Sequence, residues 1–170
     1  MDAAELKSLQ SPLKEKYRQE PASALVTLRA TGRAAEGVAC SVETGRALVK
    51  AGLHPASGGD GSYVCSGDML LQALVACAGV TLRAVATSLG FDVQDAQVTA
   101  EGDLDFRGTL GVSRETPVGF RDIRLRFDLV GSLSDEERAT LIRLTERYCV
   151  VLQTLRQAPP VAVSAGSVAA

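Results

Sequence analysis

The most constraining feature of the sequence is residues 67–89, a segment with apolar side chains at almost every helical angle, from Met69 to Leu89. A helix that is apolar on all sides is normally covered on most of them. Gln72 and Arg83 interrupt the segment, which leaves it short of the roughly 18 uncharged residues that a membrane span needs. We therefore expect a buried central helix.

Bulky side chains that could cover this helix are scarce. Only 4% of the 170 residues are aromatic and none is Trp, so the core depends on smaller side chains that bury less area each. Two chains could cover each other's central helix, which favours an obligate homodimer. The net charge of −2 supplies no cationic field for nucleic acid or a lipid surface, and we expect neither as a partner.

The remaining pattern predicts an α+β fold in a single domain. Alternating side chains indicate strands, and Ser134 with Glu137 forms a capping box that opens a second helix, continuing to Leu155. A loop rich in Gly and Ser spans residues 53–67, and residues 107–119 form a turn or mobile loop. The predicted strands are residues 24–31, 38–42, 46–50, 93–106, 120–130 and 161–165. Strands and helices in this order are typical of α+β rather than βαβ organisation.

Residues 1–22 form a polar arm that precedes the domain at residues 23–170. Leucines recur in this arm at helical spacing, but Pro12 is expected to break or cap any continuous helix. The sequence opens with acidic residues and no apolar stretch of the kind found in signal peptides. We therefore expect a cytoplasmic protein, in which cysteines are reduced, catalytic or buried rather than joined in a structural framework.

The candidate chemistry is that of cysteine. One histidine, His54, is expected to be a surface or hydrogen-bonded loop residue, and no two cysteines have the spacing of a zinc knuckle. A zinc site assembled from distant positions remains an alternative, but we expect no metal and no cofactor. Cys77 and Cys149 each lie on an apolar helical face, where a buried structural role is the competing interpretation. Cys65 precedes a helix N-terminus, where a thiol pKa can fall, and Cys40 lies in a predicted strand.

Two segments carry a resemblance to a known family. Residues 58–89 (GGDGSYVCSGDMLLQALVACAGVTLRAVATSL) resemble the glycine-rich loop and central helix of OsmC-like proteins, the osmotically inducible protein C and organic hydroperoxide resistance proteins. Residues 146–155 (ERYCVVLQTL) resemble the helix of that family that bears its other cysteine. The strand and helix order agrees over roughly residues 24–165. The resemblance implies antiparallel sheets wrapped around central helices in an intertwined dimer.

The resemblance also implies a thiol peroxidase. Cys77 would attack an organic hydroperoxide and become a sulfenic acid, and Cys149 would condense with it to a disulfide that a cellular dithiol reopens. An apolar shell around Cys77 would suit an alkyl hydroperoxide better than hydrogen peroxide. Two alternatives stay open: a non-enzymatic module of the same fold that binds an apolar or thiol-bearing small molecule, and a structural stress protein with cysteines in its core.

Two charged residues are implied to activate the thiolate. Arg33 is the best match for the family's arginine, and Arg29 and Arg46 are its competitors. Asp68, nine residues before Cys77, matches the family's carboxylate. The hydroperoxide resistance branch carries a glutamate ten residues before its cysteine, where this chain has glycine, and a serine replaces the proline that commonly precedes the acid.

Overall fold

The computed structural model describes residues 3–35, 39–42 and 51–165 of the chain. In chain order the elements are α1 (Ala3–Gln19), η1 (Pro21–Ala24), β1 (Leu25–Ala35), β2 (Ala39–Val42), β3 (Ala51–Gly52), η2 (Pro55–Ser57), β4 (Val64–Cys65), α2 (Ser66–Leu89), β5 (Asp95–Asp105), α3 (Phe106–Thr109), β6 (Phe120–Val130), α4 (Asp135–Tyr148) and α5 (Val150–Arg156). The predicted α+β class is confirmed. The predicted strand 46–50 lies outside the described residues.

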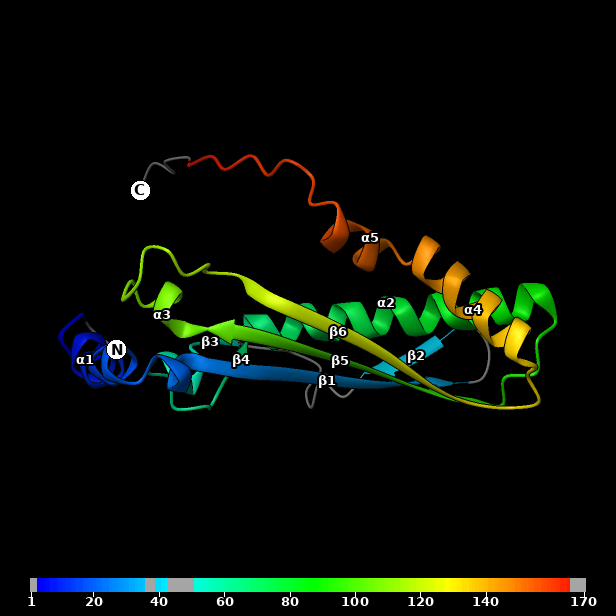
Figure 1. Ribbon diagram of the computed structural model, residues 1–170, viewed down its shortest axis with the longest axis horizontal. Coiled ribbons are helices and arrows are strands. Elements are labelled where there is room, and N and C mark those ends of the chain that lie inside the picture. The colour runs from blue at the N-terminus through cyan, green and yellow to red at the C-terminus, as the bar shows by residue number, and fades with distance from the viewer. Residues whose placement is uncertain (1–2, 36–38, 43–50, 166–170) are drawn as a thin grey trace, which may run out of the picture.

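Three long strands form an elongated antiparallel sheet with α2 lying along it (Figure 1). The strand order is β2-β1-β5-β6, and Ala100 of β5 pairs with Ala30 of β1 on one side and Leu125 of β6 on the other. Helices α4 and α5 lie across α2 on the side away from β1, so α2 is enclosed between the sheet and these two helices.

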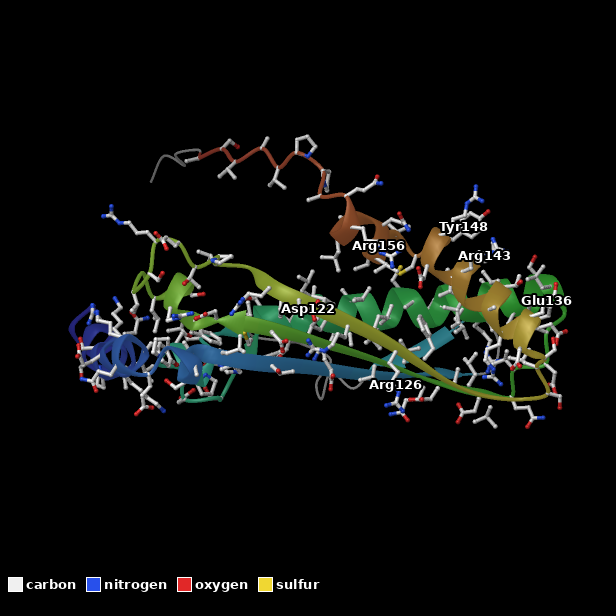
Figure 2. All side chains as sticks on the ribbon, viewed as in Figure 1. Asp122, Arg126, Glu136, Arg143, Tyr148 and Arg156 are labelled. Atoms are coloured by element: carbon white, nitrogen blue, oxygen red, sulfur yellow. The ribbon has the colours of Figure 1, made fainter. Side chains whose placement is uncertain are left out.

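The core lies between α2 and the apolar face of the sheet. Because side chains alternate along a strand, Val98 and Ala100 of β5 are buried, and Leu125 and Phe127 of β6 pack beside them. Arg126 of β6 points to the opposite face, away from the helices (Figure 2). The predicted alternation is therefore confirmed from Ile123 to Leu129, and a register shift interrupts it between Phe120 and Asp122.

Helix α2 begins one residue earlier than predicted, so that Cys65, not Ser66, is its N-cap residue. It ends at Gly90, whose φ of 68° allows its backbone N–H to bond the carbonyls of the last turn, as predicted. By length and composition α2 is apolar enough to cross a membrane, contrary to the estimate from the sequence. In this fold it is the central helix, and eight of its residues are buried.

The N-terminal arm is one continuous helix, and the expectation that Pro12 would break it is wrong. A proline inside a helix costs about 3 kcal/mol, and packing of the arm offsets this cost. Tyr17 is buried against Phe106 with Leu13 alongside, and its hydroxyl donates to the carbonyl of Ala56 at 2.6 Å.

Three further boundaries differ from the sequence prediction. The loop at 53–67 contains the 3₁₀ turn η2 and ends in β4, which pairs with β3 in a separate two-residue parallel ladder. The turn after β5 begins with the single helical turn α3. The prediction of a strand at 161–165 is wrong: the segment pairs with no described strand, and Val161 and Val163 are 82% and 93% exposed.

Candidate functional site

The second cysteine helix is broken at the cysteine itself. Cys149 has an extended ψ of 104°, ends α4 and serves as the N-cap residue of α5. The sequence had placed it inside one helix running to Leu155, so that prediction is wrong at this point. The Cys149 N–H still bonds the Thr145 carbonyl at 2.9 Å, and its own carbonyl accepts from Gln153 N–H at 2.9 Å. The chain therefore turns here with little loss of backbone hydrogen bonding.

Two side chains form contacts across this break and stabilise it. Gln153 of α5 donates through Nε2 to the Glu146 carbonyl at 2.7 Å, which gives a partner to one of the carbonyls left free where α4 ends. Arg156 of α5 forms an ion pair with the Glu146 carboxylate at 3.1 Å. Both contacts cross the break, so α5 is held at a fixed angle to α4.

The break brings Cys149 to Cys77. Cys149 is completely buried and Cys77 of α2 is half-buried, both pack in one apolar cluster, and the Cys77 thiol is close enough to contribute to the raised pKa of Cys149. Both are free thiols. The structure thus brings together two residues that lie 72 positions apart in the sequence (149 − 77).

The two cysteines share an apolar environment. Both belong to the cluster around Leu74 and Val75 of α2, with Leu152 of α5 packed against it. Burial raises the pKa of the Cys149 thiol to about 11, and the Cys77 thiol beside it adds to the rise. The backbone N–H groups of Leu152 and Val151 face the Cys149 sulfur and act in the opposite direction, without a full capping hydrogen bond.

A groove of about 380 Å³ lies between β6 and the α4–α5 pair. Its apolar lining belongs to the same cluster as the two cysteines and consists of Phe120, Ile123, Leu125, Phe127, Leu152 and Leu155. The ring of Phe120 lies over Gly102, where a Cβ would approach it within 2.5 Å. A side chain at position 102 would therefore displace the ring from the groove.

The rim of the groove is charged on both sides. Arg156 and Glu146 line it on the helical side, and Arg121 and Asp122 line it on β6; Figure 2 labels Arg156 and Asp122. Arg121 also lies 3.7 Å from the buried carboxylate of Asp105. The groove can accordingly hold an apolar body with a polar end at its mouth.

Asp68 is not brought to Cys77 within the chain. Nine residues of helix separate the two by about 13.5 Å along the axis and by about half a turn around it, so their side chains leave opposite sides of α2. Burial raises the pKa of the Asp68 carboxyl, and His54 partly opposes this rise through its charge. The predicted role of Asp68 beside the thiolate has no direct contact to support it.

The arginine candidates are placed by backbone register alone. Arg33 lies in β1, opposite Gln97 of β5 and Ser41 of β2. Its competitor Arg29 lies in the same strand opposite Glu101, and the side chains of both are outside the described part of the structure. Arg46 lies outside the described residues altogether.

The other candidate residues have local structural roles. His54 stacks on Phe106 with ring centroids 5.0 Å apart, and its Nδ1 accepts from the Ala56 N–H at 3.0 Å, so the predicted loop role is confirmed. Cys65 is half-buried at the N-cap position of α2. Cys40 pairs with Ala34 in the backbone ladder. Among residues 3–35, 39–42 and 51–165, no three His, Cys, Asp or Glu side chains gather as a metal site.

Sequence reasoning missed the groove and the backbone groups at the break. Arg156 and Glu146 are ten positions apart, and their ion pair forms only because the helix bends between them. Arg121 belongs to an outward position of a strand and carried no signal of its own. The one available hint was the paired Val150 and Val151 after Cys149, since β-branched residues are less favourable in helices.

Comparison with known proteins agrees with this architecture. The family model described as OsmC-like protein matches residues 59–164. Among solved structures, the chain is similar to an osmC-like hydroperoxide resistance protein from Jannaschia sp. CCS1, with a TM-score of 0.58 and 20% sequence identity. The match covers 81% of this chain and 91% of that one, and at this identity it concerns the fold alone. No curated protein matches the chain.

Proposed function

The chain belongs to the OsmC-like proteins, and from this premise we propose that it is a cytoplasmic thiol peroxidase that reduces organic hydroperoxides. The observation that carries the proposal is the meeting of Cys77 and Cys149, two free thiols from different helices, in one apolar site. A likeness in fold to a hydroperoxide resistance protein supports the same activity.

The reaction divides between the two cysteines. The Cys77 thiolate attacks the outer oxygen of the hydroperoxide, so that an S–O bond forms, the O–O bond breaks and the alkoxide takes a proton to leave as an alcohol. Cys77 is then a sulfenic acid. The Cys149 thiolate attacks the Cys77 sulfur, the S–S bond forms, and the oxygen leaves as hydroxide and becomes water. A cellular dithiol reduces the disulfide by exchange and is itself oxidised.

Exposure supports this order of events. Cys77 is half-buried and packs in the same apolar cluster as the groove lining, whereas Cys149 is fully buried and its raised pKa keeps it a thiol at neutral pH. The more accessible cysteine is therefore the better candidate for the peroxide, and the buried one for the second step. The apolar groove favours an alkyl or aryl group on the substrate.

We also propose that the protein is a homodimer. One side of α2, covered neither by the sheet nor by α4 and α5, carries exposed apolar residues, including Met69 and Val80, each 37% exposed. Ala73, Cys77, Val80 and Ala84 follow one another at helical spacing on this side. A second copy covering this stripe would bury it and enclose Cys77.

A second candidate function is non-enzymatic binding of an apolar small molecule. The groove of about 380 Å³ favours it, because it could hold such a ligand whether or not the thiols react. The two functions differ in whether a hydroperoxide is consumed.

The test is a single-turnover reaction of the reduced protein with one equivalent of cumene hydroperoxide, followed by peptide mapping. We expect a Cys77–Cys149 bridge and one equivalent of alcohol. Cys149→Ser should stop at the Cys77 sulfenic acid, Cys77→Ser should leave the hydroperoxide intact, and the control Cys65→Ser should behave as the unaltered protein. A bridge to Cys65 or Cys40, or an unconsumed hydroperoxide, would overturn the proposal. If the hydroperoxide is not consumed but the protein binds added cumyl alcohol, the binding function is favoured.

A further inference from the structure

One buried polar group has no use in the chemistry described so far. Thr145 of α4 is fully buried, and its hydroxyl oxygen has no hydrogen-bond partner among the described residues. A buried hydroxyl without a partner destabilises a fold, and most such groups are satisfied. A threonine in a helix can often bond the carbonyl four residues earlier, but here that bond is not made.

The position of Thr145 on α4 shows what it faces. Leu141, Thr145 and Cys149 follow at intervals of four residues and so form one stripe on α4. At one end Leu141 packs with Leu82 of α2, and at the other Cys149 lies beside Cys77. Thr145 lies between them, about 6 Å along the axis from each. Its side chain is therefore enclosed between α2 and α4, one helical turn from the thiol pair.

We propose that the Thr145 hydroxyl donates a hydrogen bond to the sulfenic acid oxygen on Cys77 and assists its departure when Cys149 attacks. This inference rests on the proposed function. In that step the S–S bond forms, the S–O bond breaks, and negative charge develops on the leaving oxygen, which takes a proton and becomes water. A donor already in place at that oxygen lowers the barrier, because it needs no reorganisation when the charge appears.

Four other donors of α4 and α5 are directed elsewhere. The backbone N–H groups of Leu152 and Val151 face the sulfur of Cys149, the attacking atom, rather than the leaving oxygen. Tyr148 and Arg143 of α4 point outward from the helix (Figure 2). The oxygen to which Thr145 would donate exists only after the peroxide has reacted, which explains why the hydroxyl is unpaired in the reduced protein.

The experiment follows the two steps separately by intact mass after rapid mixing with one equivalent of cumene hydroperoxide. The sulfenic acid adds one oxygen to the mass and the disulfide removes two hydrogens. Thr145→Val removes the donor and keeps the shape, Thr145→Ser restores a donor, and Thr140→Val is the matched control on the same helix. We expect Thr145→Val to form the sulfenic acid at the unaltered rate and the disulfide about tenfold more slowly.

The controls separate this role from a structural one. Thr145→Ser and Thr140→Val should form the disulfide within about twofold of the unaltered rate, and Thr145→Val should unfold at an equal or higher temperature because it loses an unsatisfied group. Equal rates of disulfide formation in Thr145→Val and the unaltered protein would overturn the role of Thr145 and leave the proposed function standing. So would parallel slowing of both steps. If the unaltered protein forms neither product, the proposed function itself fails.

Discussion

The buried thiol of Cys149 should make the protein lose stability in alkali. Its pKa is about 11 in the folded protein, against an ordinary value of 9.0 that applies once the chain unfolds. Between these values the folded state keeps a proton that the unfolded state releases, so the free energy of unfolding falls as the pH rises. The stability that the protonated Cys149 thiol contributes is complete below pH 9 and is lost by pH 11. Two pKa units at about 1.36 kcal/mol each give a loss of up to about 3 kcal/mol.

The assay is urea denaturation of the protein under excess reductant at pH 8, 9, 10 and 11, compared with Cys149→Ala. Other groups that titrate in this range, including Tyr17, are present in both proteins and cancel in the difference. At pH 8 the variant should be the less stable, because it loses buried packing at this site. The gap should then narrow by up to about 3 kcal/mol as the pH approaches 11.

Cys77→Ala identifies the cause of the pKa shift. Burial is the largest contribution to the raised pKa, and the neighbouring Cys77 thiol is a smaller one, so this variant should keep most of the pH dependence. A gap between the unaltered protein and Cys149→Ala that stays constant from pH 8 to pH 11 would refute the reasoning. A pH dependence that disappears in Cys77→Ala would mean that the neighbour, and not burial, holds the proton.

Three further outcomes test the core, the assembly and the activation of the site. Leu74→Ala, at a fully buried position of α2, should lower the free energy of unfolding by about 2–5 kcal/mol in urea denaturation, and a loss below about 1 kcal/mol would contradict the packing. Val80→Glu should shift sedimentation equilibrium at micromolar protein from dimer to monomer, since it charges the exposed stripe of α2; an unaltered protein that is already monomeric would contradict the dimer. Arg33→Ala should slow alkylation of Cys77 about tenfold, the effect of one lost opposite charge, whereas Asp68→Asn should change it less than twofold; the reverse order would show that Asp68 acts on the thiol.

Local patterns predicted the elements that local forces determine. The alternation in residues 120–130 predicted β6 with its bounds, because the apolar face from Ile123 to Leu129 packs against the core. Ser134 and Glu137 predicted the start of α4, and each makes its capping hydrogen bond, the serine hydroxyl accepting from the Glu137 N–H at 3.2 Å. These signals depend on neighbours within a few residues, so the local sequence is enough to predict both elements.

The errors arose where distant contacts decide the conformation. Pro12 lies inside α1 because burial of Tyr17 against Phe106 outweighs the cost of the proline. The segment 161–165 has the side-chain pattern of a strand but no described strand beside it to supply hydrogen bonds. The role of Asp68 stays a prediction: within one chain the helical geometry of α2 sets it on the side opposite Cys77.

The break at Cys149 joins structure to reactivity at one residue. Had α4 continued straight, the N–H groups of Val151 and Leu152 would have been used by carbonyls of the preceding turn, and none would face the sulfur. The extended ψ of Cys149 releases these groups while Gln153 satisfies a carbonyl left behind at the end of α4. A thiol whose burial holds its pKa near 11 can still form a thiolate for an instant if donors stand ready at the sulfur. The bend therefore supplies the donors that the apolar surroundings lack, and it does so without exposing Cys149 to water.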